Sequence, residues 1–313
     1  MRARRLGDVH VSAIGLGAMP LSVEGRPDED AAVTTIHAAL DAGVTLIDTA
    51  DSYHWHAGET GHNESLVARA LTRYGGDTGP VLVATKGGRG RPGDGSWTVT
   101  GTPEHLKNAC DASRRRLGVD TLGLYQLHKP DPRVPWAESV GALAELLDAG
   151  KVRAVGISNV DTEQIREAHA VLGGRLASVQ NRFSPAVRDS APELRLCEEL
   201  GVAFLPWSPL GGISRSVLEG PVADDRGAGH GTAYEPFHEV AREHGVSPQR
   251  VCLAWLLALS PVVVPIPGAR RAASIRDSAA AADLVLSAEE IARLARDHGS
   301  HGAVRMRSDL RVA

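Results

Sequence analysis

The chain has few cysteines and no long run of apolar residues. Three cysteines, Cys110, Cys197 and Cys252, occur among 313 residues, an odd number with no Cys-x-x-Cys spacing. This pattern argues against a disulfide framework and is typical of reduced thiols, which we expect in the helical core of a cytoplasmic protein. No segment approaches the ~18 apolar residues of a membrane span, and no signal-peptide core follows the basic N-terminus. We therefore expect neither secretion nor membrane insertion.

Charge of one sign is not in excess either. The 34 basic and 38 acidic side chains give a net charge of −4, without an acidic or basic tail. This balance gives no reason to expect a nucleic-acid partner. The composition, 42% hydrophobic and 23% charged, is that of an ordinary globular protein. Because α/β barrels reach about 250 residues or more as one unit, we expect a single domain over residues 1–313.

Short apolar segments alternate with longer amphipathic ones. After a predicted hairpin, which pairs residues 2–6 with 10–13, eight apolar segments read as strands and the segments between them as helices. One such helix begins with Thr102 as N-cap and Pro103 at its first position. The predicted strands are IGLGAM, VTLIDT, VLVATK, TLGLYQLH, VRAVGIS, ASVQ, VAFLPWS and VVVPIP. This alternation predicts a (β/α)8 TIM barrel with an N-terminal β-hairpin and extra helices and loops at its C-terminal face.

A doubly wound sheet is the competing α/β architecture. It would ordinarily bind a dinucleotide through Gly-x-Gly-x-x-Gly in its first strand-to-helix turn. This chain has only Gly15-x-Gly17, with Pro20 in the third position. The two glycines read better as a tight strand exit that lets backbone approach a ligand, so the barrel is favoured.

Four residues that can handle a proton stand at the ends of three successive predicted strands. They are Asp48 and Tyr53, Lys86, and His128. A phenol has an ordinary pKa of about 10 and becomes a useful acid when a nearby cation such as Lys86 stabilises its ionised form. Asp48 is placed to balance that cation, and His128 to bond a substrate oxygen. In a barrel the carboxyl ends of the strands carry the chemistry, so we expect these side chains to meet.

The next three predicted strands also end in polar or aromatic residues. Ser158-Asn159 and Gln180 offer groups that could hold a carboxamide, and Trp207 offers a flat face for a heteroaromatic ring. The alternative is that Trp207 only closes the barrel mouth. The last strand exits through residues 266–271 into a helix, whose start would form a phosphate site with two arginines; solvated surface arginines are the alternative.

The chain resembles the aldo-keto reductase superfamily over nearly its whole length. The motifs that carry this resemblance are GVTLIDTADSYHWHAGETGHNESLVARAL, VLVATKGG, LYQLHKPD, VRAVGISN, SVQNRFSP, FLPWSPLGG and VPIPGARR. The resemblance implies a (β/α)8 barrel that binds NADPH, less often NADH, in extended form. It also implies that Asp48, Tyr53, Lys86 and His128 are the catalytic tetrad.

The resemblance assigns the cofactor contacts as well. Ser158, Asn159 and Gln180 match the residues at the nicotinamide carboxamide, Trp207 matches the stacked aromatic, and Ser208, Leu210 and Gly212 would run beside the pyrophosphate. The segment for the 2′-phosphate and adenine comprises Gly268, Arg270, Arg271, Ser274, Asp277 and Ser278. Ser278 stands where the family often has Asn, and Asp277 where Glu or Gln is frequent. Which arginine holds the phosphate stays open.

The predicted function is NADPH-dependent reduction of an aldehyde or ketone, with hydride transfer from nicotinamide and protonation by Tyr53. In this reading Lys86, paired with Asp48, lowers the Tyr53 pKa, and no metal takes part. Two alternatives stay open. One is a redox-sensing regulatory subunit that binds the cofactor with little turnover. The other is a metal-dependent hydrolase on the same barrel, motivated by four histidines: His54, His56, His62 and His128.

Substrate choice is expected to lie in three variable segments: residues 87–101, which include Trp97, residues 211–233, and the tail after Asp297. The glycine-rich segments suggest a closing lid, or alternatively a surface loop without fixed structure. His54, Trp55 and Trp97 are the candidates for the substrate pocket. The sequence leaves open which small carbonyl compound is reduced, and in what oligomeric state.

Overall fold

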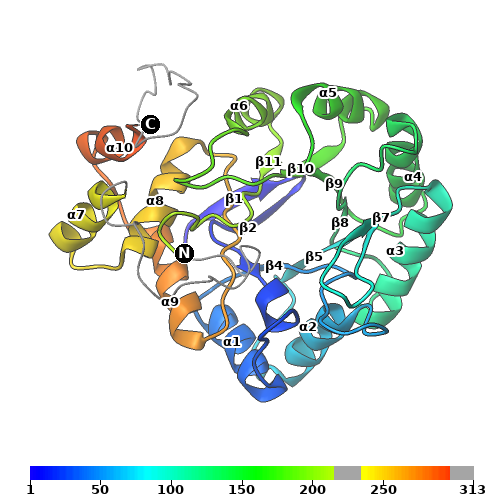
Figure 1. The fold of residues 1–313 in the computed structure, drawn as a ribbon, viewed down its shortest axis with the longest axis horizontal. Helices are drawn as coiled ribbons and strands as arrows, with labels where there is room; N and C mark the ends of the chain where they lie inside the picture. Colours follow the sequence, from blue (N-terminus) through cyan, green and yellow to red (C-terminus); the bar gives the residue numbers. More distant parts are fainter. Residues whose placement is uncertain (215–233, 297–313) are drawn as a thin grey trace.

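Parallel strands form the sheet at the centre of the molecule, and helices surround it (Figure 1). This computed structural model describes residues 1–214 and 234–296. Most of the expected lid, residues 215–233, and the tail 297–313 lie outside the described residues. Seven strands pair in the order β11-β10-β9-β8-β5-β4-β3 within the described part of the chain. They are β3 (Leu16–Gly17), β4 (Leu46–Asp48), β5 (Leu82–Gly87), β8 (Leu124–Leu127), β9 (Val155–Ser158), β10 (Leu176–Gln180) and β11 (Ala203–Phe204).

The eighth predicted strand closes the barrel without forming a regular strand. Residues 262–268 make isolated parallel bridges, to β11 on one side and β3 on the other. Gly15 N–H donates to the carbonyl of Pro265 (2.9 Å) and Gly17 N–H to that of Pro267 (3.0 Å). The prolines have no N–H to donate, so the regular strand predicted for VVVPIP does not form and only isolated bridges remain. The (β/α)8 barrel itself is confirmed.

The helices form a ring outside the strands. Side-chain oxygens of Thr102, Asp161, Ser247 and Asp28 accept N–H bonds at helix starts, which supports the boundaries read from the sequence. The barrel helices are α1 (Glu29–Asp41), α2 (His62–Arg73), α3 (Pro103–Leu117), α4 (Trp136–Asp148), α5 (Thr162–Val171), α6 (Ala191–Leu200), α8 (Pro248–Leu259) and α9 (Ala272–Ala280). Two extra helices, α7 (Glu235–His244) and α10 (Ala288–Ala295), pack outside α8 (Figure 1). No helix in the described residues is long and apolar enough to cross a membrane.

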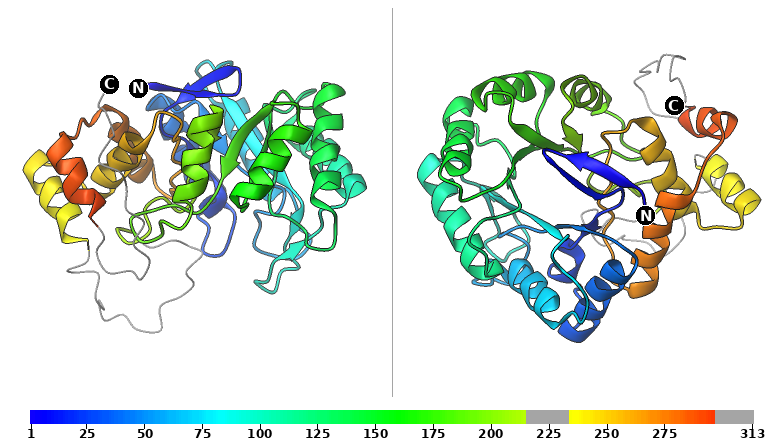
Figure 2. Two further views of the ribbon diagram at one scale, coloured as in Figure 1. Left: turned by 90° about the horizontal axis from the view of Figure 1, so that it is seen from above. Right: turned by 180° about the vertical axis from the view of Figure 1, so that it is seen from behind.

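An N-terminal hairpin covers one end of the barrel. Strands β1 (Ala3–Leu6) and β2 (Val9–Ser12) pair antiparallel, as predicted. Leu6 and Val11 are buried and belong to the cluster of apolar side chains that includes Leu46 and Leu124. Figure 2 shows this hairpin at the end of the barrel opposite to a second one, formed by β6 (Arg89–Gly90) and β7 (Thr98–Val99). The N-terminal hairpin thus seals the amino ends of the strands and leaves their carboxyl ends to form a site.

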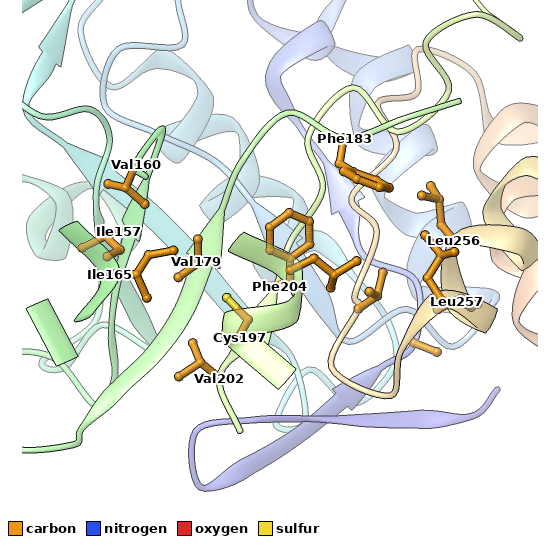
Figure 3. Close-up of a cluster of buried hydrophobic side chains, with 14 of the residues drawn as sticks. Ile157, Val160, Ile165, Val179, Phe183, Cys197, Val202, Phe204, Leu256 and Leu257 are labelled. Carbon is orange, nitrogen blue, oxygen red and sulfur yellow. The ribbon is translucent and has the colours of Figure 1, made fainter. Parts of the chain in front are cut away.

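The main core lies between the sheet and its outer helices. Phe183 packs edge to face on Phe204, with ring centroids 6.0 Å apart, and stacks on Trp255 at 6.5 Å. Figure 3 shows Cys197 beside Phe204 in this layer. All three cysteines are buried and unbonded to one another, as expected. Fully burying one large apolar side chain stabilises the fold by about 1.5–3 kcal/mol, and this core fixes the ends of β10 and β11, which lead to Gln180 and Trp207.

Candidate active site

The four proton-handling residues predicted from the sequence come together at the carboxyl ends of adjacent strands. Asp48 ends β4, Lys86 lies in β5, His128 directly follows β8, and Tyr53 lies in the loop after β4. Strand pairing sets this proximity, because β4, β5 and β8 are neighbours in the sheet. All four side chains are buried, and Lys86 is 0% exposed. A buried ammonium needs acceptors for its protons, and these define the site.

Lys86 finds three acceptors. Its Nζ donates to Asp48 Oδ1 at 2.5 Å, to the carbonyl of Thr49 at 2.9 Å, and to Tyr53 Oη at 3.1 Å. The ammonium therefore uses all its protons. Because the Tyr53 oxygen accepts from Lys86, its own proton is left to be donated elsewhere.

The second oxygen of Asp48 is held by two amides. Gln180 Nε2 donates to Asp48 Oδ2 at 2.8 Å, and Gln126 Nε2 lies 3.4 Å from it. Gln180 was predicted as a cofactor contact, and the structure gives its amide nitrogen this additional partner. Gln126 was missed by the sequence reading. Its only signal was a polar residue inside the otherwise apolar strand LYQL, which predicts a side chain inside the barrel that needs a partner.

The pKa values of the pair follow from burial and charge. Burial by itself lowers the pKa of Lys86, but the charge and hydrogen bonds of Asp48 and Tyr53 outweigh it, so this pKa is raised and the ammonium stays charged. Burial raises the pKa of Tyr53, Lys86 opposes the rise, and Asp48 adds to it. The sequence predicts that Lys86 lowers the Tyr53 pKa below its ordinary value. In the structure burial prevails, so Tyr53 keeps its proton at neutral pH.

His128 stands beside Tyr53 as a neutral imidazole. The two rings meet edge to face with centroids 5.6 Å apart, and Ser52 Oγ lies 3.4 Å from His128 Nδ1. Burial lowers the pKa of His128 well below its ordinary value, and the charges of Lys86 and Arg89 lower it further. A neutral ring with Nδ1 engaged by a hydroxyl can donate from Nε2.

A cavity of about 670 Å³ begins at Asp48, Tyr53 and His128 and continues to the start of α9. Most of the predicted site residues share its wall. They are Asp48, Tyr53, Trp97, His128, Ser158, Asn159, Gln180, Trp207, Ser208, Leu210, Gly268, Arg270, Arg271, Ser274, Asp277 and Ser278. The volume and the mixture of apolar faces with a few polar groups are typical of a cofactor or ligand site.

Lys86 does not line the cavity but contacts Asp48 and Tyr53, which do; three further predicted residues are placed elsewhere. A Cβ on Gly212 would meet the ring of Tyr234, and it is the adjacent Gly211 that lines the cavity. His54 is buried with Nδ1 2.9 Å from the carbonyl of His56, and Trp55 stacks on the His56 ring. Neither His54 nor Trp55 is part of the cavity wall described here.

Two residues of the wall have strained backbone. Among the described residues, Asn159 (φ 60°) and Ser208 (φ 48°) are the non-glycine positions with positive φ. Such conformations cost of order 1–3 kcal/mol and tend to occur at functional sites. Hydrogen bonds hold Asn159 in place: its Nδ2 donates to the carbonyl of His128 (2.9 Å) and its N–H to that of Gln180 (3.1 Å).

The far end of the cavity carries positive charge. Arg270 donates to the carbonyls of Pro20 (3.3 Å) and Glu24 (2.8 Å), and Arg271 is the N-cap of α9. Backbone N–H groups of the first turn of a helix, joined by two guanidinium groups, favour a phosphate. Asp277 is ion-paired with Arg250 at 2.7 Å, which offsets the one acidic charge of the α9 wall.

The histidines that motivated a metal site do not converge. His62 Nδ1 lies 2.8 Å from Ser22 Oγ, while His54 and His128 have the partners described above. In residues 1–214 and 234–296, no three His, Cys, Asp or Glu side chains are grouped so that they could hold a metal ion. The metal-dependent alternative therefore gains no support from the described residues.

A further carboxyl lies buried behind Lys86. The N–H of Asp51 donates to the Lys86 carbonyl (3.3 Å), but its Oδ1 has no hydrogen-bond partner in the described residues. Burial raises the pKa of Asp51 to about 8, and the nearby Glu64 adds to the rise while Arg116 opposes it. Asp51 is therefore expected to hold a proton at neutral pH.

We expect Asp51 to make stability fall as pH rises. The folded protein keeps the proton up to about pH 8, whereas the unfolded chain loses it near pH 4, so unfolding releases a proton between those values. Asp51→Asn removes this linkage. From pH 5 to pH 7 the wild type should lose about 2–3 kcal/mol relative to the variant, measured by urea unfolding at both values. Equal pH dependence in the two proteins would contradict the assignment.

Comparison with known proteins identifies the family of this chain. The family model described as the aldo/keto reductase family matches residues 13–296. The 6-dehydroglucose reductase of Novosphingobium aromaticivorans is 35% identical over 283 residues, which cover 89% of each protein.

Solved structures agree with the fold. The glycerol dehydrogenase of Gluconobacter oxydans superimposes with a TM-score of 0.81 at 28% identity, covering 97% of this chain and 99% of that one. An aldo-keto reductase of Klebsiella pneumoniae, solved in complex with NADPH, gives a TM-score of 0.73 at 28% identity, and the match covers 94% of this chain and 93% of that one. The barrel, the cavity at its mouth and a family match over most of the length lead to one conclusion: this chain is an oxidoreductase that belongs to the aldo/keto reductase family.

Proposed function

We propose that the protein reduces an aldehyde or ketone to an alcohol with NADPH, and that Tyr53 supplies the proton. The observation that carries this proposal is the chain of contacts from Asp48 through Lys86 to Tyr53 Oη, which ends at the cavity wall beside His128. Such an arrangement keeps one phenolic proton in place and next to a cation. As part of the same proposal, the protein is a single-domain cytoplasmic enzyme for a small molecule.

Each residue has a definable task in the step. Ser52 Oγ lies 3.4 Å from Nδ1 of the neutral His128. We assign the hydroxyl as the donor of this contact, which leaves Nε2–H of His128 to donate to the carbonyl oxygen and orient it. Tyr53 gives its proton to that oxygen as negative charge develops there. Lys86 then stabilises the phenolate that remains, and Asp48 keeps Lys86 in position. The nicotinamide, when bound, supplies the hydride.

The described residues fit a dinucleotide in extended form. The cavity runs from Tyr53 to α9, and Trp207 gives it an aromatic wall. Asn159 and Ser208, which have positive φ angles, also line it. Arg270, Arg271 and Ser274 would take the phosphate at the adenosine end. Two NADP(H)-bound relatives of this fold support the choice of cofactor.

The test is transfer of a labelled hydride. The protein is mixed with NADPH deuterated at C4 and a panel of aldehydes and ketones, and the alcohol products are analysed by mass spectrometry. Deuterium on the carbinol carbon is the expected result. If NADPH binds but no carbonyl compound is reduced, the regulatory-subunit alternative replaces this proposal.

Cofactor preference is expected to depend on the two arginines. Arg270→Ala/Arg271→Ala should raise the Kd for NADPH roughly 10- to 100-fold, because charge-assisted bonds to the 2′-phosphate are lost, and change the Kd for NADH by less than about threefold. Quenching of tryptophan fluorescence gives both constants, and the single variants show which arginine matters. Arg276→Ala, on an exposed position of α9, is the control. An equal loss for both cofactors would remove the phosphate assignment.

A further inference from the structure

Arg89 is a cation of the cavity wall for which the function proposed above gives no task. It opens β6, where it pairs with Val99 of β7 in the hairpin over the barrel mouth. Arg89 lines the cavity together with Tyr53, His128 and Trp97. Arg89 lies within residues 87–101, one of the variable segments expected to set substrate choice, but it is not itself among the predicted site residues.

The charge of Arg89 is not balanced within the described residues. In residues 1–214 and 234–296 no carboxylate lies within ion-pair distance of it, and its buried Nε has no hydrogen-bond partner there. Its guanidinium lies over the Trp97 ring, 4.2 Å from the centroid. Arg91, two residues on, also lies over Trp97 but is paired with Glu24 and donates to the His54 carbonyl at 2.6 Å.

The uncompensated charge acts on the reacting groups. Arg89 is among the groups that lower the pKa of His128 and that oppose the rise of the Tyr53 pKa. The nearby Lys86 is matched by Asp48, so Arg89 is the cation at this end of the cavity that has no carboxylate partner among the described residues. A half-buried cation to which the described residues offer no carboxylate is costly, and an anion that enters the cavity offsets that cost.

Resting on the proposed function, we infer that the substrate is an aldehyde or ketone that also carries an anionic group, a carboxylate or a phosphate, and that Arg89 binds this group. A guanidinium presents paired N–H donors that match two oxygens of either anion. The guanidinium group lies 4.2 Å from the centroid of the Trp97 ring, and this cation–π contact favours its position in the cavity wall. Arg89 is thus a specificity-determining residue, and the anion would sit beside the carbonyl bound at Tyr53 and His128.

Matched pairs of substrates test the inference. The 2-, 3- and 4-carboxybenzaldehydes are each compared with the corresponding neutral carboxamide. The three ring positions sample three distances between the carbonyl group and the carboxylate. Glyceraldehyde 3-phosphate is compared with glyceraldehyde to distinguish phosphate from carboxylate. In the wild type, kcat/KM for the best anionic member should exceed that of its neutral partner at least 10-fold.

Three variants locate the effect. Arg89→Gln should remove that preference: kcat/KM for the anion should fall 10- to 100-fold more than kcat/KM for its neutral partner, and any change that comes through the pKa of His128 or Tyr53 is common to both substrates. Arg89→Lys should retain part of it, because the charge remains. Arg153→Gln removes the same charge from an exposed site just before β9, at the amino end of the barrel, and should leave the preference unchanged.

The outcomes separate this inference from the proposed function. Reduction of neutral and anionic aldehydes at equal rates, or a preference that survives Arg89→Gln, overturns the inference and leaves the reductase function standing. If no aldehyde is reduced, binding is measured by tryptophan fluorescence. If the wild type then binds 4-carboxybenzaldehyde and the Arg89→Gln variant does not, the result supports the anion site alone. If the wild type does not bind it, both the anion site and the proposed reductase function are overturned.

Discussion

Replacing Tyr53 by phenylalanine is expected to lower kcat by about 10²- to 10⁴-fold, the range typical of a lost general acid. The substitution removes only the hydroxyl that accepts from Lys86 at 3.1 Å and that would donate to the substrate. The ring, buried beside His128, keeps its packing. The Kd for NADPH should change by less than about threefold, because the phenolic oxygen belongs to the proton path and not to the phosphate end of the cavity.

Steady-state kinetics with the best aldehyde of the panel, together with NADPH titration, measures both effects. Tyr74→Phe is the matched control: its hydroxyl donates to Asp41 at an exposed site far from the cavity. That variant should keep wild-type kcat. A Tyr53→Phe enzyme with full activity would mean that another group supplies the proton, and the proposed role of Tyr53 would have to be abandoned.

The second large effect is expected at Lys86. Lys86→Met leaves the Asp48 carboxylate buried without its cation, and breaking a buried pair in this way costs about 3–5 kcal/mol of unfolding free energy. It also removes the charge that stabilises the Tyr53 phenolate, so kcat should fall at least 100-fold. Urea unfolding and steady-state kinetics measure the two losses separately.

A double variant separates stability from chemistry. Asp48→Asn/Lys86→Met removes both charges, and the introduced carboxamide can still accept from the amide of Gln180, which holds Asp48 at 2.8 Å in the wild type. Most of the lost stability should return while activity does not. A stable Lys86→Met protein, or an active double variant, would show that this pair does not have the role proposed here.

Much of the architecture could be predicted because short sequence patterns mark the ends of its helices and turns. The helix starts carry side chains that cap their own backbone, such as Thr102 and Asp161, and the hairpin turns at Gly7 with positive φ. Parallel pairing then carries distant positions to one edge of the sheet. Asp48, Lys86 and His128 are each read as a strand end, and the barrel makes them neighbours without any further signal.

Contacts and pKa shifts that depend on the three-dimensional arrangement were predicted less well from the sequence. Gln126 binds Asp48 only because β4 and β8 face the same interior, and Arg89 is exceptional only because no acid lies near it in the described residues. His54 and Trp55 stand next to Tyr53 in sequence, yet the loop turns them toward His56. The raised Tyr53 pKa depends on burial depth, which a sequence does not state.

The way in which the barrel closes has a consequence for its synthesis. Gly15 and Gly17 bond residues near the other end of the chain, the carbonyls of Pro265 and Pro267. A nascent chain cannot make these bonds until almost all of it has left the ribosome, so until then the free edge of β3 has only β4 as a partner. The first barrel strand to be translated is the one that waits longest for its second neighbour.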